Sequence, residues 1–127
     1  RRQRQMCIRD RAEWNKMNGF ERRTLDVIAG CDGVLWWHRI IEKKGFHING
    51  FINHYPDFIV MMKSGKIVIV EAKGDDRDNG DSRRKLKLGQ TWAAQAGRKY
   101  RYFMTFDQNS IEGAYNLEDF ADVLIDL

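Results

Sequence analysis

The chain has 127 residues, of which 43% are hydrophobic and 12% aromatic, with a single proline. This is enough for one compact domain with a modest core and too little for two domains. No apolar run approaches the roughly 18 to 20 residues of a membrane span, and no signal sequence is present, so we expect a soluble protein without a membrane partner.

Residues 1–11 are set apart, because they match the in-frame translation of a transposase-based sequencing-library adapter. We expect them to be an assembly artefact, and residues 12–127 to be one domain cut from a longer protein. The formal net charge of +4 disappears without the five arginines and one aspartate of this segment, since 17 basic and 17 acidic residues remain. Net charge therefore does not indicate DNA binding.

Cysteine content bears on the compartment. Cys7 belongs to the excluded segment, so Cys31 stands alone. A single cysteine can form neither an internal disulfide nor a cysteine-based metal site. The sequence therefore predicts a reducing, cytoplasmic location.

The first elements follow from apolar spacing. Glu21, Leu25 and Ile28 fall on one helical stripe, which predicts a helix over 19–30 that ends at Gly30. A β-branched and aromatic run predicts a strand over 34–39. The segment 45–55 fits either a loop or a short strand pairing.

Pro56 begins the next part of the chain, at a position where a strand tolerates proline. Two apolar strands, 57–62 and 66–73, flank the turn Lys63-Ser64-Gly65 and predict a β-hairpin. The remaining predictions are an acidic loop (74–81), a helix (82–97) capped by Asp81 or Ser82, a strand (99–106) and a closing helix capped by Asn116. This α-β-β-β-α-β-α order predicts a mixed α/β layer with helices on both faces of the sheet.

The hairpin register decides whether polar side chains meet at the strand ends. Alternation places Glu71 and Lys73 on one face of their strand. If Gly65 is left-handed in a three-residue loop, Met62 pairs with Lys66, and Asp57 lies opposite Glu71 on that face. A two-residue loop instead pairs Asp57 with Ala72, on the wrong face.

In the first register, two carboxylates lie about 5 Å apart and can share one hard cation such as Mg²⁺, with Mn²⁺ as a substitute. Lys73 can then orient or help to deprotonate an attacking water, or hold a phosphate. Glu21 is a third candidate acid, because a carboxylate on an apolar stripe needs a cation or a partner. Glu13 competes for this role and ranks lower.

Pro56-Asp57 followed by Glu71-Ala72-Lys73, with a preceding helix glutamate, resembles the PD-(D/E)xK nuclease superfamily. Over residues 20–106, the segments FE, VLWWHR, YPDFIV, GKIVIVEAKG and KLKLGQTWAAQAGRKYRYFMTF resemble the C-terminal endonuclease domain of type III restriction enzymes and related DEAD/DEAH helicases. The resemblance implies a restriction-endonuclease-like αβββαβ core and a Mg²⁺-dependent endonuclease acting on double-stranded DNA.

The same resemblance assigns roles to single residues. It implies that Asp57 and Glu71 are metal ligands, Lys73 the catalytic lysine and Glu21 an auxiliary acid. It also implies a helicase-like ATPase motor upstream in the full-length chain, and a methyltransferase or specificity subunit as a further partner.

Four basic residues of the predicted helix 82–97 remain open. Lys85 shares a stripe with Leu88 and Trp92, so it is either a phosphate contact or a lysine at the edge of the core. The others are backbone contacts to DNA or solvated side chains: Arg83, Arg84 and Lys87. Two alternatives to the endonuclease also stay open, namely a resolvase- or exonuclease-like phosphodiesterase on the same fold, and a non-catalytic module that binds DNA or a partner subunit.

Overall fold

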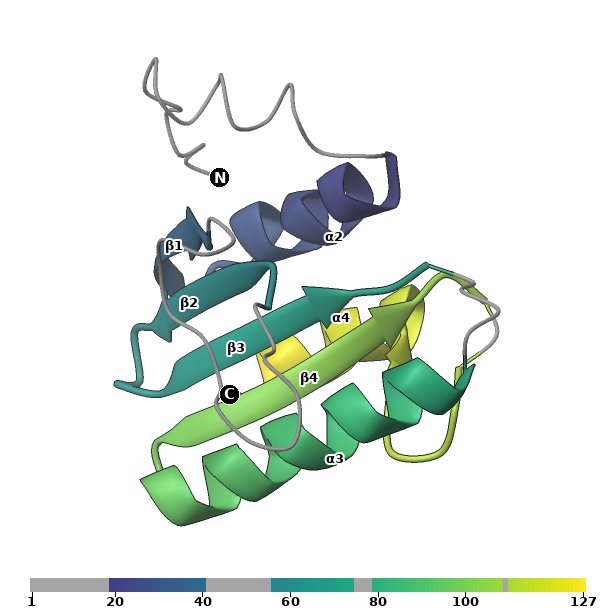
Figure 1. Ribbon diagram of the computed structural model, residues 1–127. Helices are drawn as coiled ribbons and strands as arrows, with labels where there is room; N and C mark the ends of the chain where they lie inside the picture. Colours follow the sequence, from purple (N-terminus) through teal and green to yellow (C-terminus); the bar gives the residue numbers. More distant parts are fainter. Residues whose placement is uncertain (1–18, 41–55, 75–78, 109) are drawn as a thin grey trace.

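The computed structural model describes residues 19–40, 56–74, 79–108 and 110–127. In these segments the chain forms a five-stranded mixed sheet with helices on both faces (Figure 1). The helices are α2 (Gly19–Gly30), α3 (Asn79–Ala96) and α4 (Leu117–Ile125), and the strands are β1 (Val34–Arg39), β2 (Phe58–Met62), β3 (Ile67–Ala72), β4 (Tyr100–Phe106) and β5 (Tyr115–Asn116). None of these helices is both long and apolar enough to cross a bilayer.

The strands lie in the order β1-β2-β3-β4-β5. The first three are antiparallel neighbours, whereas β4 runs parallel to β3 and β5 parallel to β4. A parallel pair needs a crossover connection, and α3 lies in the connection between β3 and β4. The carboxyl ends of β3 and β4 therefore meet at the same edge of the sheet.

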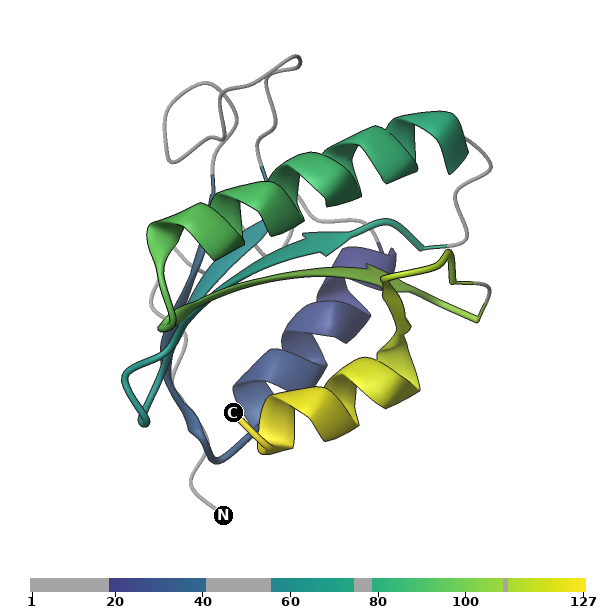
Figure 2. The same cartoon turned by 90° about the horizontal axis from the view of Figure 1, so that it is seen from below.

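A separate apolar core fills each side of the sheet. Figure 2 shows α3 over one face, with α2 and α4 together over the other. Buried residues on the α2/α4 side are Leu25, Ile28, Val34, Phe58, Val60, Met62, Val68, Val70, Phe103, Phe120 and Leu124. Those on the α3 side are Ile69, Leu86, Leu88, Tyr102, Met104 and Phe106. Because β3 is covered on both faces, its run of aliphatic side chains is buried, as predicted.

The hairpin adopts the register that brings the acids together. Gly65 has φ +96°, in the left-handed region, and the Met62 N–H donates to the Lys66 carbonyl oxygen at 2.8 Å. Phe58 pairs with Val70 at the far end of the ladder, so Asp57 comes beside Glu71. Of the two registers left open by the sequence, the structure therefore has the one with a three-residue loop, and the two-residue alternative is excluded.

The predicted element order and coarse α/β class are confirmed, with strand limits within one residue for β1, β2, β3 and β4. The prediction that Asp81 or Ser82 caps α3 was wrong, because the helix begins at Asn79 and both residues lie in its first turn. Strand β5 was not predicted, since two residues carry too short a pattern. The Asn116 cap is confirmed, because its side chain accepts from the Asp119 N–H at 2.8 Å. Segments 1–11 and 45–55, with Glu13, lie outside the described residues.

Candidate active site

Asp57 and Glu71 form a pair of adjacent carboxyl groups where β2 begins and β3 ends. A side-chain hydrogen bond joins them, and the Ala72 N–H donates to Asp57 Oδ2 at 2.8 Å. On the far side of Glu71, β4 supplies the Thr105 hydroxyl, which donates to the Glu71 carbonyl oxygen at 3.4 Å. Both acids are thus tied to paired backbone, and rigid strands are suited to fixing the geometry of a site.

Both carboxyl groups are difficult to ionise in this environment. Burial is the main cause that raises the pKa of Asp57 well above its usual value, and the charge of Glu71 adds to the effect. For Glu71, burial raises the pKa to about 7, although the nearby charges of Lys85 and Lys73 act in the opposite direction. Paired buried acids with displaced pKa values are typical of functional sites.

Two lysines approach this pair from different elements. Lys73 follows β3, its side chain is 11% exposed, and its Nζ lies 4.0 Å from Asp81 Oδ2. Lys85 comes from α3, and its Nζ lies 3.3 Å from the same oxygen. Lys85 is the nearby charge that most favours ionised Glu71, followed by Lys73. Lys85 therefore leans toward the sheet, as its position on the stripe of Leu88 and Trp92 indicates.

Glu21 joins the site from the opposite side of the sheet. It lies in the first turn of α2 and forms a side-chain hydrogen bond with Asp57. Its charge also acts on Glu71. The structure therefore brings Glu21, Asp57, Glu71 and Lys73 together, as the sequence analysis expected.

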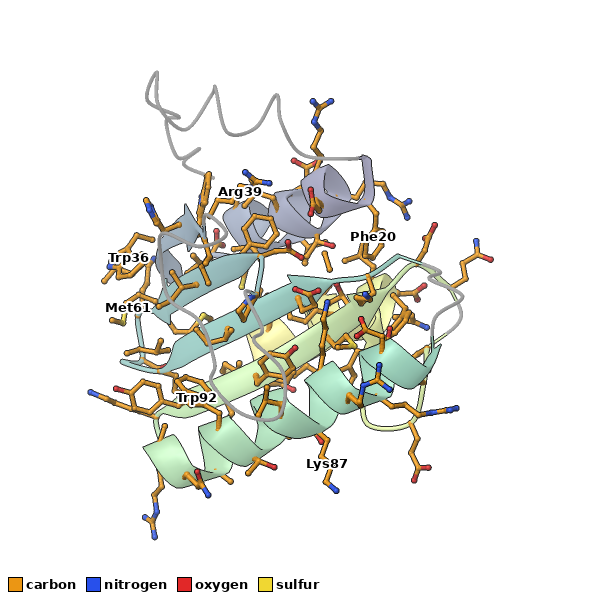
Figure 3. The ribbon with its side chains drawn as sticks, in the orientation of Figure 1. Phe20, Trp36, Arg39, Met61, Lys87 and Trp92 are labelled. Atoms are coloured by element: carbon orange, nitrogen blue, oxygen red, sulfur yellow. The ribbon has the colours of Figure 1, made fainter. Side chains whose placement is uncertain are left out.

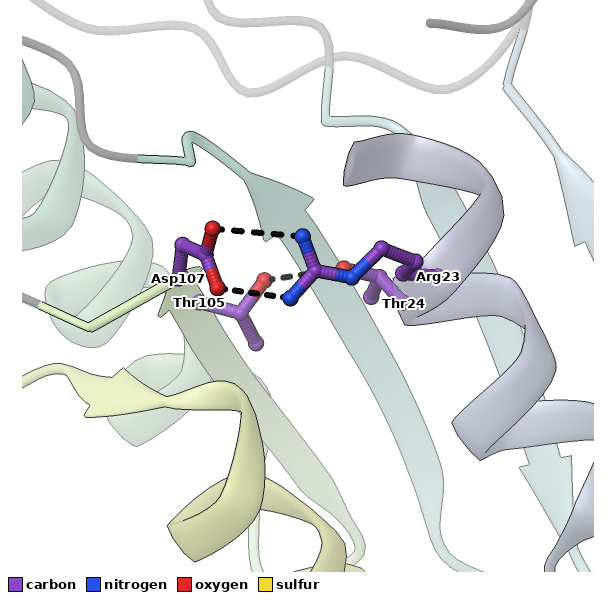
Figure 4. A network of polar contacts seen from close by, with 4 residues as sticks. All are labelled: Arg23, Thr24, Thr105 and Asp107. Atoms are coloured by element: carbon purple, nitrogen blue, oxygen red, sulfur yellow. Dashed lines mark hydrogen bonds and ion pairs between the residues drawn. The ribbon is translucent and has the colours of Figure 1, made fainter. Parts of the chain in front are cut away.

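Contacts between α2 and the end of β4 hold that first turn in place (Figure 4). Arg23 donates to both carboxylate oxygens of Asp107, at 2.6 and 3.2 Å, and this contact lowers the pKa of Asp107. One residue on, the buried Thr24 and Thr105 hydroxyls lie 3.4 Å apart. Because Arg23 and Thr24 follow Glu21 directly along α2, these contacts help to fix the part of the helix that presents the third acid.

The other predicted basic residues of α3 lie away from the carboxyl pair. Arg83 and Lys87 are exposed and line a shallow hollow that also includes Glu112. In Figure 3, Lys87 points away from the sheet. Arg84 is also exposed, although its guanidinium lies 3.7 Å from Asp81 Oδ1. Their assignment as contacts to the DNA backbone stays a prediction.

Two residues of the site were missed by the sequence analysis. Asp81 was assigned only as a helix cap, and its spacing of four residues from Lys85 becomes informative only if α3 starts earlier. Tyr102 was not among the candidate site residues. Burial is the main cause that raises the pKa of its phenol, and the charges of Glu71 and Asp57 add to the effect. No local pattern identifies Tyr102, because β4 and α3 position it through tertiary contacts.

A second hollow lies between α2 and α4, on the face of the sheet opposite α3. Its lining residues are Asp26, Val27, Gly30, Cys31, Asp32, Gly33, Ala121 and Ile125. None of these is basic, and no acid of the Asp57–Glu71 pair is among them. This hollow is therefore separate from the acid pair at the strand ends.

The carboxyl pair fits a cation that keeps some of its waters. Within the described segments, no group of three or more His, Cys, Asp or Glu side chains is arranged to hold a metal ion. Magnesium is commonly bound by one or two carboxylates, with waters and substrate phosphate oxygens completing its shell. Glu71 Oε1 is buried and accepts no hydrogen bond from any residue that the structure describes. Such an acceptor requires a partner, and a cation would satisfy it.

Comparison of the chain with protein families, with curated proteins and with solved structures finds no match. The resemblance to the PD-(D/E)xK nucleases therefore rests on the segments quoted above.

Proposed function

We propose that this domain is a Mg²⁺-dependent DNA endonuclease of the PD-(D/E)xK type. The observation that carries the proposal is that Asp57, Glu71 and Lys73 lie together at one sheet edge. There, Glu71 Oε1 is buried and has no hydrogen-bond partner among the described residues. The α-β-β-β-α-β order from α2 to β4 supports the proposal, because the sequence resemblance implies the same order. A stability role explains the cluster poorly, because buried charges cost about as much in desolvation as they gain in attraction.

The residues divide the work of phosphodiester hydrolysis. Asp57 and Glu71 would hold the cation, which would supply a water of lowered pKa and would neutralise charge on the phosphate. The Lys73 ammonium stabilises the negative phosphoryl oxygens or orients the water. Glu21 is hydrogen-bonded to Asp57 and helps to hold that carboxyl group in position. Hydrolysis then forms one P–O bond from water, breaks one P–O ester bond, and leaves a proton on the departing oxygen.

The larger setting is part of the same proposal. The sequence resemblance suggests that the domain is the cleavage module of a type III-like restriction or helicase protein. An ATPase motor in the same full-length chain would deliver double-stranded DNA, and a methyltransferase or specificity subunit would select the site. Mn²⁺ would replace Mg²⁺, since both accept oxygen ligands.

The test is cleavage of supercoiled plasmid by the full 127-residue chain with Mg²⁺, with Mn²⁺ or with EDTA. We expect metal-dependent nicking that falls at least about 100-fold in Asp57→Asn and in Lys73→Met, because each removes charge from the reacting centre. Asp122→Asn is the matched control, since Asp122 is exposed on α4 and should retain full activity.

Two results would contradict the proposal. Metal-dependent nicking that persists in both site variants would show that other residues cut the DNA. Retention of plasmid in a gel-shift assay, without any cleavage in either metal, would favour a module that only binds DNA.

A further inference from the structure

Asp81 is shared by cations that come from two elements. Its Oδ2 faces the Nζ of Lys85 at 3.3 Å and the Nζ of Lys73 at 4.0 Å, while its Oδ1 lies 3.7 Å from Arg84. Asp81 Oδ2 thus lies close to two ammonium groups, one from the end of β3 and one from the first turns of α3. The two lysines are held as a pair that neither element would form alone.

The pair also faces Glu71. Both ammonium groups favour the ionised form of that carboxyl, Lys85 more than Lys73. The two Nζ groups therefore lie near the metal-ligand end of the site as well as near Asp81. This places them beside the position where a phosphate would meet the cation held by Asp57 and Glu71.

The contact with Asp81 is of a kind that another anion can replace. The Asp81 side chain is 28% exposed and that of Lys85 26% exposed, so water reaches the ion pair. Ion pairs of this exposure contribute little net free energy, because solvent screens the attraction. Phosphate oxygens accept charge-assisted hydrogen bonds from ammonium groups, and a phosphodiester presents two non-bridging oxygens to a pair of donors.

We propose that Lys73 and Lys85 form one phosphate-binding subsite and that Asp81 is its resident counter-ion, which the phosphate of the substrate displaces. Arg84 already contacts the second oxygen of Asp81, so the displaced carboxylate keeps a partner. The role of this subsite in DNA cleavage rests on the proposed nuclease function. The exchange of Asp81 for phosphate is a property of the three side chains and can be tested without metal or DNA.

The test uses inorganic phosphate and the full chain in EDTA at one fixed, near-neutral pH. Lysine Cε–Hε cross-peaks in two-dimensional NMR report each ammonium group separately, and Lys73→Gln, Lys85→Gln and Lys87→Gln assign the peaks. Lys87 is the matched control for the subsite, because it lies two residues from Lys85 on α3 but points away from the sheet (Figure 3). The contact with the DNA backbone predicted for Lys87 lies outside the pair formed by Lys73 and Lys85.

We expect the Lys73 and Lys85 peaks to shift together with one Kd, while the Lys87 peak shows no saturable shift. Lys85→Gln should weaken the binding at the Lys73 peak about fivefold or more, because one of two donors is lost. Lys87→Gln should leave it unchanged. Asp81→Asn should tighten phosphate binding about threefold, because the competing anion is gone while its shape is kept.

Several results would overturn the proposal. Equal shifts at Lys87 would mean that phosphate only joins the ion atmosphere of the helix. Different Kd values at Lys73 and Lys85 would mean that they do not act as a pair. Unchanged or weaker binding in Asp81→Asn would mean that Asp81 orders the lysines without competing with phosphate. If Asp81→Asn does not fold, the comparison of Lys85→Gln with Lys87→Gln still decides whether the subsite exists.

The outcome is separable from that of the nuclease proposal. Phosphate binding as described, with no plasmid cleavage in any metal, would retain the subsite and reject the nuclease. Metal-dependent cleavage through Asp57 and Lys73, without paired phosphate binding, would retain the nuclease and reject the subsite.

Discussion

Glu71 is 7% exposed, and its carboxyl group lies against that of Asp57 inside the sheet edge. Two buried acids at this separation cannot both ionise at low cost, because each loses hydration and repels the other. Lys73 and Lys85 offset only part of this cost, since the pKa of Glu71 still rises to about 7. In the absence of a metal ion, the acid pair therefore lowers the free energy of unfolding of the domain at neutral pH.

The first prediction concerns stability against pH in EDTA. The pKa of Glu71 is raised from 4.5 in the unfolded chain to about 7 in the folded one, so the folded state binds more protons between these values. Its stabilising contribution is present below about pH 4.5 and is lost as the pH rises through about 7, by up to about 3 kcal/mol. Urea denaturation at a series of pH values measures this decline.

Glu71→Gln provides the comparison for this prediction, because the amide keeps the shape and cannot titrate. We expect a flatter stability profile over the same pH range, with the remaining slope arising from Asp57, whose pKa is also raised. Asp122→Asn, on the exposed face of α4, should reproduce the wild-type profile. An equal decline in Glu71→Gln and wild type would show that Glu71 is ionised in the metal-free protein.

At the scale of elements, the hairpin shows what local sequence can determine. Lys63-Ser64-Gly65 sets the loop length, and the left-handed Gly65 sets the pairing of β2 with β3. Since side chains alternate, this one loop decides that Asp57 and Glu71 share a face. The carboxyl pair and Lys73 were therefore predictable from residues 57–73 alone.

The start of α3 was not predictable in the same way. The acidic, glycine-containing stretch before it reads as loop, and Asp81 reads as a cap. In the structure the helix continues back to Asn79, because its first turns lie beside the strand ends and Asp81 pairs with Lys73 and Lys85. A tertiary ion pair thus replaces the local capping role that the sequence favours.

The second prediction concerns the contact of α3 with β4. A Cβ added at Gly89 would clash with the Tyr102 ring, which is buried beneath the helix. Gly89→Ala should therefore destabilise the domain by about 1 to 3 kcal/mol through overpacking, despite the better helix propensity of alanine. Thermal or urea unfolding in the presence of EDTA measures the change.

Gly30→Ala is the control for that substitution. Gly30 ends α2, and a Cβ there meets no atom within 4 Å. Alanine should be neutral or slightly stabilising at this position. Unchanged stability in Gly89→Ala would mean that the helix and Tyr102 separate at no cost, and that α3 does not fix the lysine pair against the sheet.

At the scale of the whole molecule, the site is an assembly of four elements. Glu21 comes from α2, Asp57 from the start of β2, Glu71 and Lys73 from the end of β3, and Lys85 from α3. The element order and the strand positions were predicted from the sequence, because apolar periodicity is strong in these segments. The contacts of Arg23 with Asp107 and of Thr24 with Thr105 join residues about 80 positions apart, so they leave no local pattern in the sequence. The position of Tyr102 likewise depends on tertiary contacts.

The central claim is that Asp57 and Glu71 together hold a divalent cation, and binding of Mn²⁺ measured by electron paramagnetic resonance tests it most directly. We predict that wild type and Asp122→Asn bind Mn²⁺ equally, that Mg²⁺ competes for the site, and that Glu71→Gln and Asp57→Asn each weaken binding at least about 10-fold. Equal Mn²⁺ affinity in wild type and both site variants, or no binding by the folded wild type, would contradict the claim.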